Sequence, residues 1–253
     1  MINDDELLKL IKEVLNENEQ KGFYTEGYKK VDARLKVKHL TAAKERVRRV
    51  MGENDLLCPQ RQTNPRGPKN HDGTIIPLAP NNIWGTDMTT TYTRNNGKVH
   101  VWAVIDHHNS ELLGIHVSKS ANRYQAMEPV SQAVSNIFSS HEENCAKGIL
   151  IRHDHGSQYM SNKFQNHISH FGMVSSPSFV RTPEGNGVIE RFFRTLKENC
   201  LWLEISEDIE SLQERLNKFM ETYNNDWILH RLGFKTPRQV RENWVEENDQ
   251  TAA

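Results

Sequence analysis

The chain has 253 residues, of which 36% are hydrophobic and 26% charged, and its formal net charge at pH 7 is −1. This composition is that of a globular protein, and the length fits one large domain with a smaller one. No run approaches the roughly 18 apolar residues of a membrane helix, and no basic-then-apolar leader opens the chain. The three cysteines share no CxxC spacing, which argues against disulfides and a cysteine zinc site. We therefore expect a cytosolic protein without a membrane partner.

The near-neutral net charge conceals a basic N-terminal part. Residues 21–80 contain 13 Lys and Arg against 6 Asp and Glu, which gives this stretch a charge of +7. The compensating acids lie in the first twenty residues, between Glu204 and Glu214, and after Glu242. A localised basic region attracts phosphate even when the whole molecule is nearly neutral. A solvated charged face without a ligand is the alternative interpretation.

The first 57 residues carry the apolar spacing of three short helices. Apolar residues recur every three or four positions between Asp4 and Leu15, and helices are also predicted around Tyr28 to Leu35 and Lys44 to Met51. The basic side chains of the third helix are Arg46, Arg48 and Arg49. This pattern predicts a helix-turn-helix domain over residues 1–57 whose three arginines contact DNA phosphates. Small helical bundles without a DNA function share the pattern, and the third helix could instead pack on the rest of the protein.

A second domain is predicted after a linker over residues 58–80, which is rich in proline and glycine. Strand-like sequences at 83–93, 98–106 and 111–118 are joined by short turns, as in an antiparallel meander. Helices are then predicted at 123–138, 162–171, from 186 and at 206–223, with short strands at 148–151 and 173–175. This order predicts an α/β domain over residues 81–245, with a mixed sheet flanked by helices and an acidic tail at 246–253.

Three carboxylates stand where such a sheet can open into a pocket. Asp87 lies inside the first strand, where burial of a charge is unfavourable unless something compensates it. Asp154 follows the fourth strand, at the end where α/β sheets commonly place ligand groups. Glu190 lies one turn into a helix. The polar stripe of that helix comprises Asn186, Glu190, Arg194 and Lys197.

Carboxylates that converge from separate elements repel one another unless cations lie between them. Magnesium, or manganese in its place, suits hard oxygen ligands and leaves room for substrate phosphate oxygens. Two ions about 3.5 to 4 Å apart can stabilise the attacking and leaving oxygens of a phosphoryl displacement. We therefore predict Asp87, Asp154 and Glu190 as catalytic ligands of two ions, with Asp87 as the bridge. Lys197 and Arg194 would then face the DNA backbone beside the metals.

The sequence around these acids resembles a known family. Thirty-five residues separate Asp154 from Glu190, and a basic residue follows seven positions later, as in the DD(35)E signature of retroviral integrases and related transposases. The matching segments include WGTDMT at 84–89, HDHGSQY at 153–159, GNGVIE at 185–190 and FFRTLK at 192–197. The resemblance covers residues 81–244. It is closest to the catalytic second-reading-frame protein (OrfB type) of insertion sequences whose full transposase is made by frameshifting.

The resemblance implies a ribonuclease-H-like integrase core preceded by a small all-α helix-turn-helix domain. It implies a transposase that cleaves and joins insertion-element DNA, with water and then a DNA 3′-hydroxyl as nucleophiles. The implied partners are double-stranded DNA, both terminal repeats and target, further copies of the chain on that DNA, and an upstream-frame protein or fusion. The implied location is the bacterial cytoplasm, on the nucleoid when DNA is bound. Two alternatives remain: a nuclease that cuts without joining, and a non-catalytic DNA-binding regulator.

Other polar residues near the acids have competing interpretations. Family members commonly carry a small residue at the position of His153, and often Arg at that of His155. We predict that His155 points toward the metals or DNA. A zinc site on the two histidines is the weaker alternative, because no further Cys or His has suitable spacing. Asp106 is expected to start a turn rather than bind metal, and Tyr159 and Trp84 are expected to pack locally or in the core.

Overall fold

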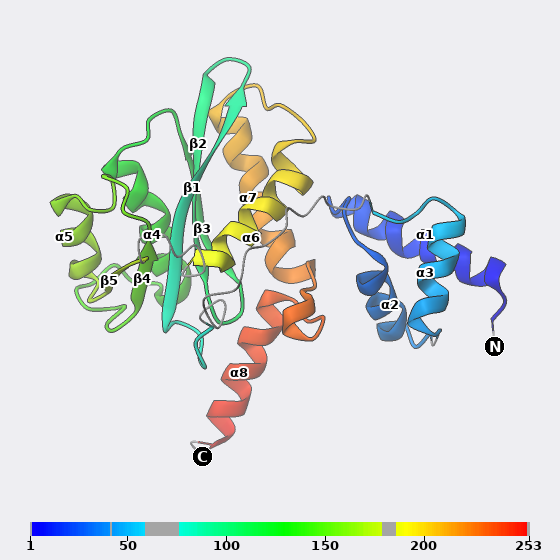
Figure 1. Ribbon diagram of the computed structural model, residues 1–253. Helices are drawn as coiled ribbons and strands as arrows, with labels where there is room; N and C mark the ends of the chain where they lie inside the picture. Colours follow the sequence, from blue (N-terminus) through cyan, green and yellow to red (C-terminus); the bar gives the residue numbers. More distant parts are fainter. Residues whose placement is uncertain (1, 41, 59–75, 179–185, 252–253) are drawn as a thin grey trace, which may run out of the picture. The chain divides into compact units, whose positions relative to one another are not determined.

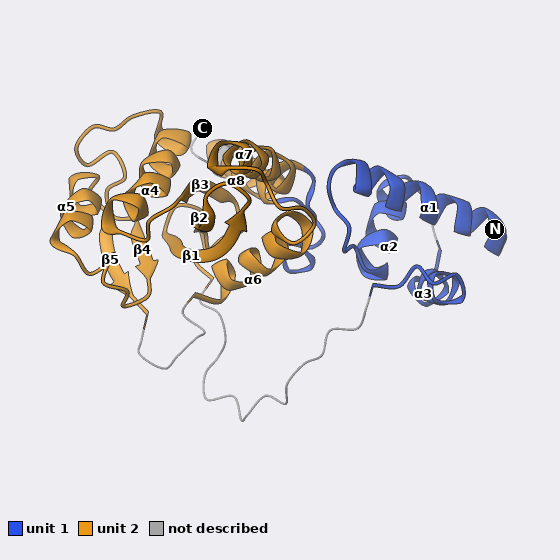
Figure 2. Ribbon diagram, turned by 90° about the horizontal axis from the view of Figure 1, so that it is seen from above, with its two compact units in different colours: residues 1–72, 226–236 blue, residues 73–225, 237–253 orange. Residues whose placement is uncertain are grey.

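The computed structural model describes residues 2–40, 42–58, 76–178 and 186–251. The chain forms two compact units, shown in different colours in Figure 2. The first unit comprises residues 1–72 and 226–236, and the second comprises residues 73–225 and 237–253. Residues 59–75 of the predicted linker lie outside the described residues. None of the described helices is long and apolar enough to cross a membrane.

The first unit contains the three predicted helices, α1 (Asp4–Gln20), α2 (Tyr28–Val37) and α3 (Lys44–Glu53) (Figure 1). A reciprocal capping box begins α1, because the Asn3 side chain accepts the Glu6 N–H (2.8 Å) and the Glu6 carboxylate accepts the Asn3 N–H (3.1 Å). The buried faces of the helices meet in one apolar cluster. Its members are Leu7, Ile11, Val14, Val31, Leu35, Val47, Val50 and Met51.

The segment 226–236 also belongs to the first unit, although we predicted it within the second domain. Trp227 of this segment is buried, and its ring packs edge-on against Phe23 with the ring centroids 4.7 Å apart. The Lys30 ammonium lies over the same indole ring, 3.0 Å from its centroid. Arg34 donates a hydrogen bond to the Asp226 carbonyl (3.0 Å). The segment contains the short helix η3 (His230–Leu232). Burial of Trp227 against α2 explains why the segment groups with the helices rather than with its neighbours in sequence.

The second unit is a five-stranded mixed sheet flanked by helices. The strands are β1 (Ile83–Thr93), β2 (Gly97–Asp106), β3 (Leu112–Ser118), β4 (Leu150–His153) and β5 (Val174–Pro177), in the order β3-β2-β1-β4-β5. The first three form the predicted antiparallel meander, and β4 and β5 run parallel to β1 and to each other. The helices are α4 (Arg123–Phe138), α5 (Asn162–His170), α6 (Gly187–Leu196), α7 (Ile209–Asp226) and α8 (Pro237–Thr251), with a π-helical turn η2 (Lys197–Leu201) after α6.

Different helices cover the two faces of the sheet (Figures 1 and 2). Trp84 and Trp102 are buried on the face covered by α4 and α5, in a core that includes Tyr159 and Phe164. Successive residues of a strand point to opposite faces. Gly85 and Asp87 therefore point to the other face, where α6 lies against β1 and β2. The predicted fold class is thus confirmed, and it sets Asp87 opposite the helix that carries Glu190.

Several element boundaries differ from the predictions. β4 begins two residues later and β5 one residue later than predicted, because the parallel register pairs Ile83 with Leu150 and Leu150 with Val174. α7 begins and ends three residues later than predicted. α8 continues to Thr251, so the acidic residues predicted as a separate tail lie in this helix.

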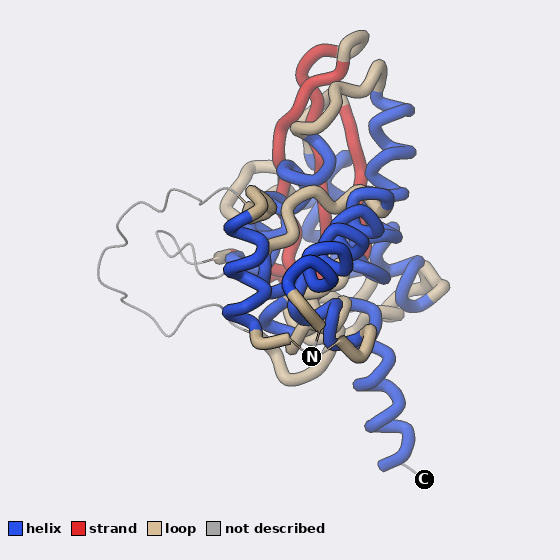
Figure 3. The backbone as a smooth tube through the Cα atoms, turned by 90° about the vertical axis from the view of Figure 1, so that its right-hand side faces the viewer, coloured by secondary structure: helices blue, strands red, loops and turns tan. Residues whose placement is uncertain are grey.

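The long β1–β2 hairpin, red in Figure 3, is held near its tip by two backbone hydrogen bonds. The Arg94 N–H donates to the Ser206 carbonyl (3.0 Å), and the Asn95 N–H donates to the Glu207 carbonyl (2.8 Å).

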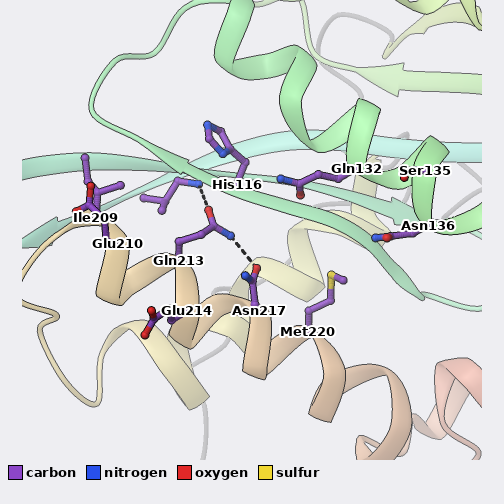
Figure 4. A pocket seen from close by; sticks show the side chains of 11 residues that line it. His116, Gln132, Ser135, Asn136, Ile209, Glu210, Gln213, Glu214, Asn217 and Met220 are labelled. Carbon is purple, nitrogen blue, oxygen red and sulfur yellow. Dashed lines mark hydrogen bonds between the residues drawn. The ribbon is translucent and has the colours of Figure 1, made fainter. Parts of the chain in front are cut away.

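The outer edge of β3 is satisfied by amide side chains instead of another strand. Gln213 of α7 donates to the Ile115 carbonyl (3.1 Å) and accepts the Val117 N–H (2.9 Å), beside a groove between α4 and α7 (Figure 4). Three further amides bond to the backbone of β3: Gln132, Asn136 and Asn224. An open strand edge invites pairing with another chain, and these side chains occupy it.

A buried ionic cluster fastens α8 to the sheet. Arg241 pairs with Asp106 (3.1 Å) and with Glu111, and it donates to the Asn81 side chain (3.2 Å). Asp106 also accepts the backbone N–H of His108 (2.8 Å) and that of Asn81 (2.7 Å). The first of these bonds forms the predicted turn at Asp106. The Asp106 carboxylate is therefore fully engaged in structure.

We predict that Arg241→Met destabilises the second unit by about 3 to 5 kcal/mol, because it leaves the buried Asp106 carboxylate without its cation and leaves Glu111 with Arg238 alone. Urea unfolding followed by tryptophan fluorescence measures the change. Arg94→Met is the matched control: it removes an exposed pair with Glu207 (3.1 Å) and should cost at most about 1 kcal/mol. Equal losses in the two variants would contradict this account of the cluster.

Candidate active site

Asp87 is a half-buried carboxylate in the middle of β1, opposite Ala103 of β2. Its Oδ1 accepts the Met88 N–H (2.7 Å). The pKa of Asp87 is raised to about 6, first by burial and then by the negative charges of Asp154 and Glu190, while the Met88 N–H and the Lys197 ammonium oppose the rise. Both other predicted acids therefore act electrostatically on Asp87.

Asp154 begins a tight turn directly after β4 and is exposed. Its Oδ1 accepts the Gly156 N–H (2.8 Å), which closes a turn on the side chain of Asp154 itself. A Cβ at position 156 would lie 2.3 Å from the Gln158 amide nitrogen and 2.8 Å from that same Asp154 oxygen. A larger residue there would therefore force both side chains to move.

Glu190 stands on the exposed side of α6, whose other side is buried through Val188, Ile189, Phe192, Phe193 and Leu196. Desolvation by the surrounding protein raises the pKa of Glu190, and the Arg191 guanidinium opposes the rise.

The start of α6 approaches β1 at Gly85. A Cβ there would lie 2.5 Å from His107 Nε2 and 3.0 Å from Asn186 Oδ1. Asn186 is accordingly buried at this contact, whereas Glu190 and Arg194 of the same predicted polar stripe are exposed.

Lys197 and Arg194 continue the helix that carries Glu190. Lys197 is half-buried where α6 passes into the π-helical turn η2, and its positive charge lowers the pKa of Asp87. Arg194 is exposed and pairs with Glu198 (3.0 Å) one turn further on. The π turn is closed by the Trp202 N–H, which donates to the Lys197 carbonyl (2.9 Å). Such turns occur frequently at functional sites.

The two histidines beside Asp154 have different environments. His155 is exposed in the turn. His153 is buried; Nδ1 lies 2.6 Å from the Asp154 carbonyl oxygen and Nε2 lies 2.8 Å from Ser175 Oγ. Burial lowers the pKa of His153. Because both ring nitrogens are engaged, His153 has no free nitrogen for zinc, which argues against the alternative zinc site. Tyr159 and Trp84 lie in the core, as predicted.

The donor set suits a hard divalent cation, because it consists of carboxylate oxygens, and the negative charges of Asp154 and Glu190 both raise the pKa of Asp87. In the part of the chain that the structure describes, no three His, Cys, Asp or Glu side chains are grouped closely enough to hold a metal ion as they stand. Uncompensated carboxylates repel one another, and a cation between them removes that repulsion.

Comparison with known proteins identifies the family. A model of the integrase core domain matches residues 77–183, a second integrase core model matches residues 173–237, and a model of an HTH-like domain matches residues 3–63. The chain is 28% identical over 244 residues to the transposase InsK of insertion sequence element IS150 from Escherichia coli K12, across 92% of this chain and 82% of that protein. The chain belongs to the integrase-core transposases of insertion sequences.

Further comparisons agree with this membership of the integrase-core transposases. The chain is 26% identical over 197 residues to the transposase InsD of insertion element IS2E from Escherichia coli K12, across 77% of this chain and 89% of that protein. The cryoEM structure of the simian T-cell lymphotropic virus intasome, in complex with PP2A regulatory subunit B56 gamma, matches 83% of this chain and 70% of the matched chain. Its TM-score is 0.52 at 17% identity, a likeness that shows the integrase-core fold.

In the HTH-like domain of this transposase, each predicted DNA-contacting arginine pairs with an acid. Arg46 and Arg49 both bind the Asp4 carboxylate (2.6 and 2.7 Å), which lowers the pKa of Asp4, with Arg49 as the larger cause. The remaining pairs are Arg49 with Glu53 (3.0 Å) and Arg48 with Glu45 (3.5 Å). DNA phosphates would have to replace these carboxylates at the guanidinium groups.

Sequence analysis did not predict the contacts of three residues near the acids. Gly85 leaves space for Asn186 at the start of α6, Gly156 lies against the Asp154 side chain, and His153 bonds to the main chain of Asp154. A glycine inside a strand pattern signals close approach of another segment, and this signal was available at Gly85. The contacts of His153 depend on β5 and could not be read from spacing.

We predict that Asp87→Asn stabilises the metal-free protein at pH 7. A rise of the Asp87 pKa from 3.8 to about 6 destabilises the fold by on the order of 2 to 3 kcal/mol, so melting should rise by roughly 4 to 10 °C. The raised pKa makes this penalty complete above about pH 6, and it disappears as the pH falls toward 4. Thermal melts in EDTA across this range measure it. Adding Mg²⁺ should stabilise the parent but not the variant; a lower melting temperature for Asp87→Asn at pH 7 would contradict the prediction.

Proposed function

We propose that this integrase-core protein is a DNA transposase in which Asp87, Asp154 and Glu190 form the catalytic site. The observation that carries the proposal is that β4 runs parallel to β1 with Arg152 beside Gly85, so that Asp154 follows the strand next to that of Asp87, while α6 carries Glu190 against β1. Asp154 and Glu190 also both raise the pKa of Asp87. Three acids distant in sequence therefore share one region of negative potential. The 35 residues between Asp154 and Glu190, followed by Lys197, support the same assignment.

The three carboxylates would hold two divalent cations, magnesium or manganese, with Asp87 between them. Such ions would supply charge stabilisation for the attacking and leaving oxygens of phosphoryl transfer. Asp87 is half-buried in a strand, whereas Asp154 in its turn and Glu190 on the surface of α6 are exposed. Metal binding would bring these two exposed carboxylates to Asp87.

The substrate is proposed to be double-stranded DNA, both the terminal repeats of the element and the target. Lys197, beside the acids, would neutralise a phosphate near the scissile bond, with Arg194 and His155 at the margin of the site. Arg46, Arg48 and Arg49 would contact the DNA backbone through the HTH-like domain. Several copies of the chain would assemble on two element ends in the bacterial cytoplasm, on nucleoid DNA, together with an upstream-frame protein or as a fusion with it.

We predict that Asp87→Asn, Asp154→Asn and Glu190→Gln each lower the cleavage rate by about 1,000-fold or more, because loss of a metal ligand removes several kcal/mol of transition-state stabilisation. The assay uses labelled duplexes with the element ends and Mg²⁺, and separates cleaved from joined products; DNA binding serves as the folding control. Cleavage without any joined product in the parent would favour a nuclease. Variants that keep every activity of the parent would favour a non-catalytic regulator.

We predict that Lys197→Ala weakens binding to all DNA sequences alike and lowers the slope of log affinity against log salt by about 1. The reason is that Lys197 would neutralise one phosphate, which releases about one counterion. Fluorescence anisotropy at several salt concentrations measures the slope. Lys98→Ala, an exposed lysine in the β1–β2 hairpin, is the control and should leave the slope unchanged. An unchanged slope in Lys197→Ala would contradict the phosphate contact.

A further inference from the structure

His153, the last residue of β4, belongs to a hydrogen-bond chain whose direction can be assigned. Its Nδ1 lies 2.6 Å from the Asp154 carbonyl oxygen, and because a carbonyl only accepts, Nδ1 carries the proton. Nε2 of the neutral ring therefore accepts, and the Ser175 hydroxyl, 2.8 Å away on β5, must donate to it. Two contacts thus select one tautomer of His153.

The chain extends one step further, into α5. Gln165 Nε2 donates to Ser175 Oγ (3.2 Å) and to the Tyr159 carbonyl (2.8 Å). An amide nitrogen carries two hydrogens, so it satisfies both acceptors together. Gln165 therefore links Ser175 to the far end of the turn that starts at Asp154.

Packing fixes the same imidazole ring. His153 is fully buried, stacks on Tyr159 with ring centroids 5.3 Å apart, and meets Phe164 edge-on at 5.9 Å. A ring held through both nitrogens and by two aromatic neighbours has one orientation. The strand ends at His153, and the following residues form an exposed turn in which the bond from Nδ1 restrains the Asp154 carbonyl.

We propose that His153 is a positioning residue, which aims the Asp154 carboxylate at the site shared with Asp87 and Glu190 by holding the Asp154 carbonyl. This inference rests on the proposed function, which gives the orientation of Asp154 a catalytic purpose. Misplacement of a catalytic group by about 1 Å can slow a reaction on the order of 100-fold. One buried hydrogen bond can therefore matter more for rate than for stability.

Two substitutions separate positioning from packing. His153→Leu keeps an apolar side chain of similar size but removes both bonds, whereas His153→Asn keeps an N–H close to the position of Nδ1 and loses the ring packing. We expect His153→Asn to melt no higher than His153→Leu and yet to cleave faster, with the Leu variant slower than the parent on the order of 100-fold. If cleavage rates instead follow melting temperatures across the three proteins, the inference is overturned.

Metal binding gives a second readout that does not depend on turnover. The Mg²⁺ concentration that produces half of the thermal stabilisation should rise in His153→Leu and in Ser175→Ala, because each breaks the chain that holds Asp154. Ser176→Ala is the matched control, since the Ser176 hydroxyl instead accepts a bond from Arg152 (3.2 Å), and it should titrate like the parent. Equal shifts in both serine variants would overturn the inference.

Asp154→Asn distinguishes failure of the inference from failure of the proposed function. If Asp154→Asn cleaves DNA as the parent does, the proposed function is wrong. If Asp154→Asn is inactive while the His153 and Ser175 variants titrate Mg²⁺ and cleave like the parent, the site stands and only the positioning role is wrong.

Discussion

The mutual repulsion of carboxylates is the constraint on which the site depends. Asp87 is placed in the middle of a strand, where burial and two neighbouring acids disfavour its charged form. A fold that only maximised stability would carry an uncharged residue at this position. The retained carboxylate is explained if a cation neutralises it during function. The same negative region explains the chemistry that membership of the integrase-core transposases implies.

Neighbouring residues constrain the segments that carry the three acids. Gly85 lets the helix of Glu190 approach the strand of Asp87, Gly156 lets the turn close on Asp154, and His153 holds the main chain at the end of β4. Elsewhere the protein compensates its buried charges within the fold: Arg241 neutralises Asp106 and Glu111. Asp106 and Glu111 are thus neutralised within the fold, whereas Asp87 is left for a ligand.

Much of this could be predicted from the sequence, because local patterns carried it. β-branched runs located β1, β2 and β3. The spacing of three acids predicted the candidate site. The sequence could not give what depends on distant partners. The position of β4 depends on its pairing with β1. Asn186 is buried because Gly85 leaves space for its side chain. Segment 226–236 belongs to the first unit because Trp227 packs there. The arginines of α3 were recognisable as basic, but their pairing with Asp4 and Glu53 was not.

The most direct test of the shared site is a crystal structure of the protein with Mn²⁺, recorded at a wavelength where manganese scatters anomalously. The account predicts anomalous peaks at ligand distance, roughly 2.0 to 2.2 Å, from carboxylate oxygens of Asp87, Asp154 and Glu190. Manganese bound elsewhere, with these three carboxylates apart and without metal between them, would contradict it.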